Sequence, residues 1–238
     1  MKKVLITGGS RGIGEACVRL FAENGSKVAF LYNKSEERAD RVAKETGALA
    51  VRCDISDMAS LKTAVSAASE WLGGVDVLVN NAGTALIKLL GDTSDEEMLS
   101  VFRTDLLAAT VACREASRDM VRAQKGYIVN IGSVWGRVGA SCESVYSAAK
   151  AGLRGLTMAL AKELGPSNIT VNCIEPGVIL TDMNASLDEE TLAELKEATP
   201  LCRMGGASEI AEAVLWLTSG KADFVTGQCI GIDGGFGL

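Results

Sequence analysis

The stretch that decides the fold is residues 4–14, Val-Leu-Ile-Thr-Gly-Gly-Ser-Arg-Gly-Ile-Gly. Its apolar start is typical of a strand buried on both faces, and glycines at positions 8, 12 and 14 precede a helical pattern. Because glycine has no Cβ, such a loop can turn sharply and approach a ligand closely. The N–H groups at the start of the helix would then face a phosphate. The spacing is G-x-x-x-G-x-G, which predicts a nucleotide site or, alternatively, an ordinary tight turn.

Outward from this loop, short β-type runs alternate with helical patterns, as parallel βαβ units require. We predict strands at 4–7, 27–32, 48–52, 75–79, 127–131, 170–174 and 229–232, and helices at 12–24, 36–46, 60–72, 95–123, 144–164 and 208–217. The right-handed crossover rule then gives a Rossmann-type doubly wound α/β/α sandwich with a mostly parallel, seven-stranded sheet, in one domain over residues 1–238. The polar, acidic segment 181–200 interrupts the alternation, and we expect a lid there.

Composition excludes several classes of function. A net charge of −6 argues against nucleic-acid binding, which needs a basic patch. No apolar run is long enough for a membrane span or a signal peptide, so we expect a cytoplasmic protein that binds no membrane. The seven cysteines form no C-x-x-C pair, which favours free thiols in a reducing compartment. The chain has no histidine, so Ser-His-Asp catalysis is excluded and no metal is expected.

Three residues could carry acid–base chemistry. Tyr146 and Lys150 lie four apart in a helical pattern, and Ser133 stands at the end of the fifth predicted strand, so all three can meet at the ligand crevice. A free tyrosine has a pKa of about 10. A neighbouring Lys⁺ and an oxidised nicotinamide would lower that pKa and let Tyr146 exchange a proton with a substrate oxygen, which Ser133 would also hydrogen-bond. By itself, however, a Tyr-x-x-x-Lys pair also occurs by chance on surface helices.

Taken together, these motifs resemble those of the short-chain dehydrogenase/reductase family, and the resemblance runs nearly from end to end. Thr7–Gly14, Asn80–Gly83, Ser133, Tyr146-x-x-x-Lys150 and Pro176-Gly177 occur in the family's order and at its usual spacing. The resemblance implies an NAD(P)-dependent oxidoreductase that reduces a carbonyl group or oxidises the matching alcohol. The hydride itself would belong to the cofactor.

The resemblance also implies roles for individual residues. Asp54 would hydrogen-bond the adenine, Asn81 to Gly83 would line the adenosine side, and Lys150 would bind the nicotinamide ribose. Asn81 could alternatively serve only to tie neighbouring strands together. The full set of expected cofactor-binding residues is Gly8, Ser10, Arg11, Gly12, Ile13, Gly14, Asn33, Lys34, Ser35, Asp54, Ile55, Asn81, Ala82, Gly83, Tyr146, Lys150, Pro176, Gly177, Val178, Ile179 and Thr181.

Asp105 departs from the family pattern, which usually has asparagine at this point of the long helix. In the family a kink there holds a water that leads protons to the lysine, and the contact is thought to run through a backbone carbonyl. We therefore count Asp105 with Ser133, Tyr146 and Lys150 as catalytic and expect reduced but present activity. Its carboxylate could instead raise the pKa of Lys150.

The cofactor preference is predicted from the end of the second strand, Tyr32-Asn33-Lys34-Ser35, which lacks the acidic residue that binds the ribose 2′-hydroxyl of NAD. Arg11 and Lys34 could meet a 2′-phosphate, so we expect NADP(H) to be preferred over NAD(H). Both could alternatively be solvated surface charges, and Glu36 and Glu37 keep the alternative open.

Fewer features of the sequence indicate the substrate than indicate the cofactor. Among its relatives the chain resembles bacterial β-ketoacyl-carrier-protein (3-oxoacyl-ACP) reductases, and a few stretches resemble a branch that reduces a 5-aminopentanone group on elongation factor P. Either implies a small-molecule or carrier-borne ketone. Glu175 could pair with a cationic substrate or be solvated. Expected substrate-wall residues, which could also be packing residues, are Trp135, Val138, Cys142, Asn184 and Leu187.

Three functions are therefore compared. The first is an NADPH-dependent ketoreductase, the second an alcohol or hydroxysteroid dehydrogenase of the same family, and the third a non-catalytic NADP(H) sensor. Intact Ser133, Tyr146 and Lys150 argue against the sensor, and Asp105 is its only support. The family resemblance also implies a homotetramer, or a homodimer.

Overall fold

The computed structural model describes residues 1–181 and 188–237. Within this part of the chain the main sheet has seven parallel strands in the order β3-β2-β1-β4-β5-β6-β9. This confirms the predicted doubly wound fold. The order reverses between β1 and β4, and ligands of such sheets bind in the crevice at this point. The strands are β1 (Lys3–Thr7), β2 (Lys27–Tyr32), β3 (Leu49–Arg52), β4 (Val77–Asn80), β5 (Gly126–Ile131), β6 (Ile169–Pro176) and β9 (Cys229–Ile232).

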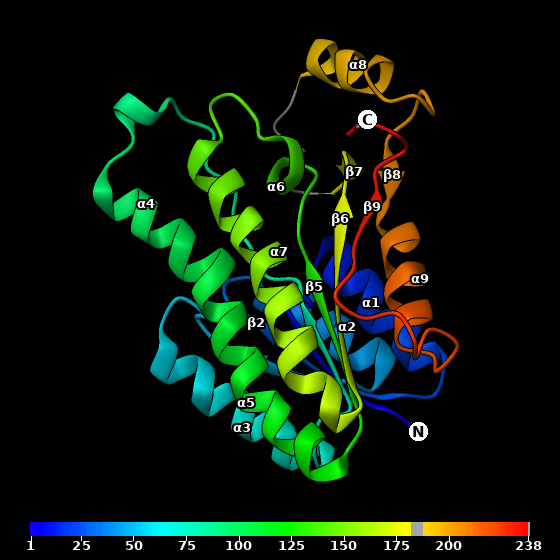
Figure 1. The fold of residues 1–238 in the computed structure, drawn as a ribbon. Coiled ribbons are helices and arrows are strands. Elements are labelled where there is room, and N and C mark those ends of the chain that lie inside the picture. Colours follow the sequence, from blue (N-terminus) through cyan, green and yellow to red (C-terminus); the bar gives the residue numbers. More distant parts are fainter. Residues whose placement is uncertain (182–187, 238) are drawn as a thin grey trace.

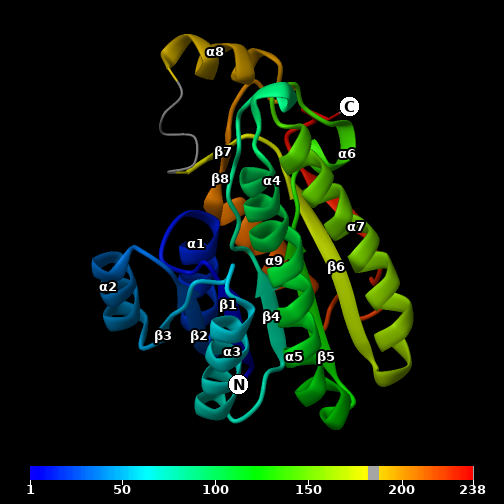
Figure 2. The same cartoon turned by 90° about the vertical axis from the view of Figure 1, so that its left-hand side faces the viewer.

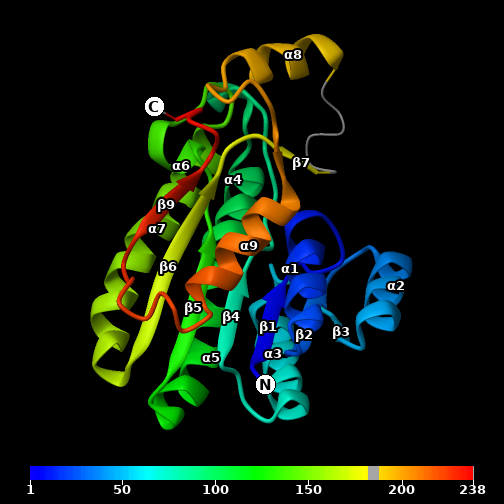
Figure 3. The same cartoon turned by 90° about the vertical axis from the view of Figure 1, so that its right-hand side faces the viewer.

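Helices cover both faces of the sheet (Figures 1 and 3). One layer contains α1 (Gly12–Glu23), α2 (Glu36–Thr46) and α9 (Ala207–Leu217). The other contains α3 (Met58–Leu72), α4 (Asp95–Phe102), α5 (Ala108–Ala123) and α7 (Ser144–Leu164). Short elements complete the chain: α6 (Trp135–Val138), α8 (Glu189–Glu197), the 3₁₀ turns η1 (Leu90–Asp92) and η3 (Gly165–Ser167), the π-helix η2 (Arg103–Leu107), and a small sheet of β7 (Ile179–Leu180) and β8 (Gly205–Gly206).

The alternation of side chains along each strand divides the core in two. In β1, Val4 and Ile6 face the layer of α1 and α9, whereas Leu5 between them faces the layer of α3 and α5. All three are fully buried. Because both faces are covered, the strand has the continuous apolar sequence from which it was predicted.

The structure corrects the predicted elements at two places. The single helix predicted over 95–123 is divided by the π-helix η2, which contains Asp105. The family resemblance implied a kink there, and the structure changes from α-helix to π-helix at this point. Helix α8 occupies part of the segment 181–200, where we expected a lid and predicted no helix. It begins after Asp188, whose carboxylate accepts a hydrogen bond from the N–H of Thr191 at 2.8 Å, and it lies at the carboxyl end of the sheet (Figure 2).

In the described ranges no helix combines the length and the apolar character needed to cross a membrane.

Candidate active site

The loop after β1 is shaped by its glycines. Gly8 and Gly12 have φ values of +71° and +56°, a region that side chains disfavour. A Cβ on Gly14 would stand 2.1 Å from the carbonyl oxygen of Gly8, so a larger residue there would force the loop open. Helix α1 starts at Gly12, and among the described residues the Arg11 side chain makes no capping hydrogen bond to it. The N–H groups at the start of α1 therefore receive no cap from the Arg11 side chain. They remain available to hydrogen-bond a phosphate.

Asn81 fixes this loop to the end of β4. Its amide nitrogen donates to the carbonyl oxygens of Thr7 at 3.0 Å and Gly8 at 3.1 Å. The Thr7 hydroxyl in turn accepts from the backbone N–H groups of Asn81 and Ala82, both at 3.0 Å. The strand-tying role that the sequence left open for Asn81 is therefore present. It holds the two strands on either side of the switch point together.

The expected adenosine end lies at the tips of β2 and β3. Asn33 and Lys34 are exposed there, as is Arg11 in the neighbouring loop. Hydrogen bonds from the Ser56 hydroxyl and N–H, and one from Asn33, hold the pKa of Asp54 below its usual value. The structure thus brings Asn33 and Asp54 together from different strands. Ser35 and Ile55, next to them in the sequence, are half-buried.

The predicted catalytic residues meet at the carboxyl end of β5. Ser133, Tyr146 and Lys150 are 8%, 8% and 3% exposed, and the Ser133 hydroxyl accepts a hydrogen bond from the N–H of Trp135 at 3.1 Å. The Lys150 Nζ lies 5.5 Å from the centre of the Tyr146 ring and donates to the carbonyl oxygen of Ile131 at 3.2 Å. A buried phenol, a hydroxyl and an ammonium thus share one small volume, as the sequence predicted.

Asp105 joins this group as a charged partner. Its side chain is fully buried, and its Oδ1 lies 3.2 Å from the Nζ of Lys150. The backbone N–H of Thr84 donates to the same carboxylate at 3.1 and 3.3 Å. Gly83 makes room for the pair, since a Cβ there would stand 2.6 Å from Oδ1 of Asp105. The family resemblance suggested a water relay through the backbone, whereas here the side chain itself pairs with the lysine.

Opposing effects act on the pKa of Tyr146, and Lys150 lowers it, as expected. Burial raises it, and the Asp105 carboxylate adds to the increase, so the opposing effect of Lys150 is outweighed. Burial lowers the pKa of Lys150, but the negative charges of Tyr146 and Asp105 reverse this and the net pKa is raised. The raising effect of Asp105 on Lys150, one of two possibilities in the sequence, is therefore present. Both shifts favour the protonated forms of the phenol and the ammonium.

The segment after β6 closes the other side of the crevice. The Pro176 carbonyl oxygen accepts from the N–H of Val134 at 2.9 Å, and Gly177 lies so close to Asp233 that a Cβ on it would stand 2.7 Å from the Asp233 Cα. Thr181 faces the glycine loop, since a Cβ on Gly12 would stand 3.4 Å from its methyl carbon. The glycine loop and the segment after β6 therefore lie next to each other at Gly12 and Thr181.

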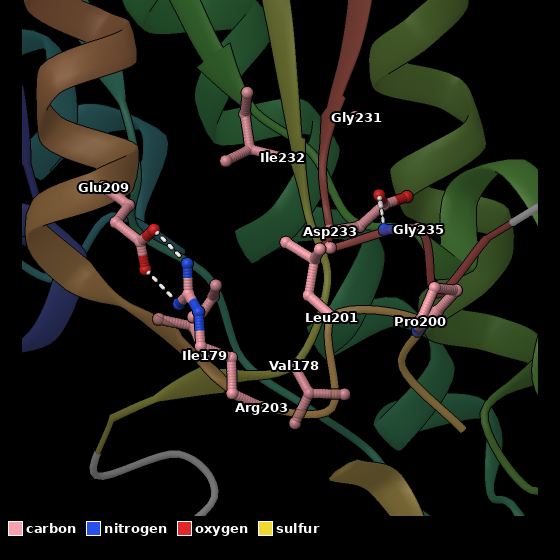
Figure 4. Close-up of a pocket in the computed structure, with 12 residues that line it drawn as sticks. Val178, Ile179, Pro200, Leu201, Arg203, Glu209, Gly231, Ile232, Asp233 and Gly235 are labelled. Carbon is pink, nitrogen blue, oxygen red and sulfur yellow. Dashed lines mark hydrogen bonds and ion pairs between the residues drawn. The ribbon is translucent and has the colours of Figure 1, made fainter. Parts of the chain in front are cut away.

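Val178 and Ile179 also line a pocket of about 530 Å³ between β7, β8 and the end of β9 (Figure 4). An ion pair between Arg203 and Glu209, at 2.7 Å, lies on one side of it. The lining includes neither Ser133 nor Tyr146 nor Lys150. We therefore assign this pocket to the periphery of the expected cofactor site and not to the reacting centre.

The expected substrate wall is placed in part. Trp135 and Val138 lie on α6, close to Ser133, and Cys142 lies in the loop that follows, with a φ of +62°. Asn184 and Leu187 are outside the described residues.

The C-terminal residues pack against α6, a contact that the sequence did not indicate. The Phe236 ring packs edge-on against Trp135, with centroids 5.3 Å apart, and Arg137 pairs with Asp233. An aromatic pair and an ion pair thus join the last residues of the chain to α6. No spacing rule connects positions so far apart in the sequence.

Glu175 corrects a further expectation, because it is neither solvated nor free to meet a substrate. It is 1% exposed and its Oε1 pairs with the guanidinium of Arg154, one turn beyond Lys150 on α7.

A nicotinamide dinucleotide fits the residues present. The glycine loop would hold its pyrophosphate at the start of α1, the tips of β2 and β3 its adenosine, and Lys150 its second ribose. The glycine loop has no room for a Cβ on Gly14, and a buried group of Ser133, Tyr146 and Lys150 lies beyond it. Together these two features define the class of protein as a nicotinamide-dependent oxidoreductase.

Comparison with known proteins agrees with this class. Residues 8–237 match the model of the family described as "Enoyl-(Acyl carrier protein) reductase". A 3-oxoacyl-[acyl-carrier-protein] reductase of Bos taurus is 41% identical over all of this chain and 98% of its own length, and the 3-oxoacyl-[acyl-carrier-protein] reductase FabG of Chlamydia pneumoniae is 37% identical over 98% of this chain and 96% of its own. A short-chain dehydrogenase/reductase from Serratia marcescens has a TM-score of 0.94 at 36% identity, covering 100% of this chain and 98% of that one. The chain belongs to the short-chain dehydrogenase/reductase family, whose members are oxidoreductases acting on CH–OH and C=O groups.

The glycine cradle gives a first prediction. Replacing Gly14 by Ala should lower the free energy of unfolding by about 1–3 kcal/mol, because the added Cβ overlaps the Gly8 carbonyl, and should weaken dinucleotide binding. Denaturant unfolding and a cofactor titration measure the two effects. Gly155→Ala is the matched control, since that glycine lies within α7 with nothing within 4 Å of its Cβ position. It should instead stabilise the protein by about 0.5–1 kcal/mol. Equal effects of the two substitutions would contradict the steric account.

The Asp105–Lys150 pair gives a second prediction. Asp105→Asn removes a negative charge that raises the pKa of both Tyr146 and Lys150. Carbonyl reduction needs a protonated phenol, so its rate should fall at a lower pH in the variant, with the alkaline limb of the kcat/KM profile shifted down by about one pH unit. The exposed Asp92→Asn serves as the control and should leave the profile unchanged. Superimposable profiles for wild type and Asp105→Asn would show that this charge does not act on the tyrosine.

Proposed function

We propose that this chain uses NADPH to reduce the ketone of a 3-oxoacyl thioester, or of a similar ketone borne on a carrier. The observation that carries the proposal is the buried group of Ser133, Tyr146 and Lys150, in which the Lys150 Nζ lies 5.5 Å from the centre of the Tyr146 ring. Two hydroxyls that converge beside an ammonium are suited to bind one oxygen atom. A carbonyl oxygen supplies that atom, whereas a carbon–carbon double bond does not.

Each residue of the site would have its own role in the reduction of the carbonyl group. When bound, the nicotinamide supplies the hydride to the carbonyl carbon. The Ser133 hydroxyl donates a hydrogen bond to the carbonyl oxygen and orients it. Tyr146 gives its proton to that oxygen as the alcohol forms, and the raised pKa of its phenol keeps the proton available at neutral pH. The Lys150 ammonium then stabilises the phenolate left behind, at a distance of 5.5 Å from the ring centre.

The preference for NADPH is supported by charge. No acidic residue stands at the tip of β2, where Asn33 and Lys34 are exposed, and Arg11 is exposed in the adjacent glycine loop. A 2′-phosphate between these two cations would form charge-assisted hydrogen bonds, which a 2′-hydroxyl cannot form as strongly. The names of the relatives at 37–41% identity support a 3-oxoacyl thioester as the substrate.

Tyr146→Phe tests the proposed reaction. NADPH consumption with a 3-oxobutanoyl thioester should fall by about 10²–10⁴-fold in this variant, because proton transfer is lost while the cofactor still binds. Tyr127→Phe is the matched control, since its hydroxyl donates to Asp223 at 2.9 Å, outside the site, and it should keep full turnover. A wild type that binds NADPH but turns over neither this thioester nor simple ketones would favour a sensor. Faster oxidation of a steroid or simple alcohol would favour a dehydrogenase.

The cofactor preference has its own test. In the double variant Arg11→Ala, Lys34→Ala, kcat/KM for NADPH should fall by about 10-fold or more, because one charge-assisted contact contributes roughly 1.5–3 kcal/mol. The value for NADH should change little. Lys44→Ala, an exposed cation on α2, should alter neither value. Equal losses with both cofactors would contradict recognition of the 2′-phosphate.

A further inference from the structure

A second group of chemically active side chains lies on β6 and β9. Cys173 and Glu175 are two residues apart on β6, so they face the same side of the sheet. Cys229 is the register partner of Cys173 on β9. The two sulfur atoms and a carboxylate oxygen all lie within 4.8 Å of one another. Two thiols and a carboxylate from distant parts of the sequence therefore meet at one point, which we call the thiol–carboxylate cluster.

Only one of the two oxygens of the Glu175 carboxylate has a partner among the described residues. Glu175 Oε1 pairs with Arg154 on α7, but Oε2 is buried and has no hydrogen-bond partner among the described residues. A buried, unpartnered carboxylate oxygen costs free energy unless another positive or donor group meets it. Since Glu175 is 1% exposed, bulk water is a poor candidate for that group. An unpaired lone pair thus belongs to the residue that also lies beside the two thiols.

The two thiols differ in how accessible they are. Cys173 is fully buried, whereas Cys229 is half-buried. A small cation could therefore reach the cluster from the Cys229 side.

The charges indicate what the cluster would bind. Two thiolates and the Glu175 carboxylate carry three negative charges, and Arg154 supplies one positive charge. A divalent cation makes the sum zero. Thiolates select thiophilic ions over magnesium or calcium, and tetrahedral zinc accepts two sulfurs, one carboxylate oxygen and one water. Zinc–sulfur bonds of about 2.3 Å place two ligand sulfurs about 3.8 Å apart. The three ligand atoms of the cluster lie within 4.8 Å of one another.

We propose that Cys173, Glu175 and Cys229 form a binding site for Zn²⁺, with Glu175 Oε2 as the carboxylate ligand and Arg154 holding Oε1. Binding would release the remaining thiol protons to solvent and would link β6 to β9. None of its three proposed ligands is Ser133, Tyr146 or Lys150, and the inference does not rest on the proposed function. A bound zinc ion would differ from the expectation that the chain, lacking histidine, holds no metal.

Metal titration of the reduced, metal-free protein tests the proposal. Zn²⁺ competed against a colorimetric chelator should bind with one equivalent per chain, and Cys229→Ser should weaken this binding by more than about 100-fold, beyond the loss that outer contacts cause. Glu175→Gln should weaken it by a smaller factor. The exposed Cys202→Ser is the matched control and should bind as the wild type does.

A second measurement needs no variant. Co²⁺ added to the wild type should give the absorption of a tetrahedral site with thiolate charge-transfer bands, and Zn²⁺ should displace it. Equal Zn²⁺ affinity in wild type and Cys229→Ser, or an octahedral Co²⁺ spectrum without thiolate bands, would overturn the proposal. So would a protein that takes up no zinc while mild oxidation joins Cys173 to Cys229 in a disulfide, because the pair would then be a redox dithiol.

Discussion

The candidate active site depends on the contacts that the buried ammonium of Lys150 makes. It lies between the carbonyl oxygen of β5 at Ile131, the Asp105 carboxylate and the Tyr146 ring, and is almost entirely removed from water. A lone cation in such a place would be costly, so each neighbour is needed. The π-helix at Arg103–Leu107 turns Asp105 toward the lysine, and Gly83 leaves the room for it. The π-helix, the absence of a Cβ on Gly83 and the position of Lys150 on α7 together place the carboxylate beside the ammonium.

Much of this could be predicted from the sequence because it depends on local rules. The continuous apolar run of β1 and the glycines of Thr7–Gly14 indicate a buried parallel strand followed by a close turn. Tyr146 and Lys150 share a helix face through their spacing alone. Ser133 follows a strand that ends at the same edge of the sheet as β1. The periodicity of apolar residues, the spacing of the motifs and the direction of the strands were sufficient to predict these features.

The remainder depends on which distant residues become neighbours, and on how far each is buried. The sequence indicated Asp105 as unusual but could not tell a side-chain ion pair from a backbone relay. Lys150 lowers the pKa of Tyr146, as expected, but burial, whose extent the sequence does not show, outweighs this effect and the net pKa is raised. Glu175 seemed available to solvent because its partner, Arg154, lies on another element. Cys173 and Cys229 become partners only through the pairing of β6 with β9, which no C-x-x-C motif announces.

The attachment of the C-terminal residues to α6 has a consequence for the order of folding. Synthesis proceeds from the N-terminus, so the glycine loop and its partner Asn81 leave the ribosome long before Asp233 and Phe236. The aromatic contact with Trp135 and the ion pair with Arg137 therefore cannot form until synthesis has passed these residues. Until then α6 lacks the two contacts that join it to the segment after β9.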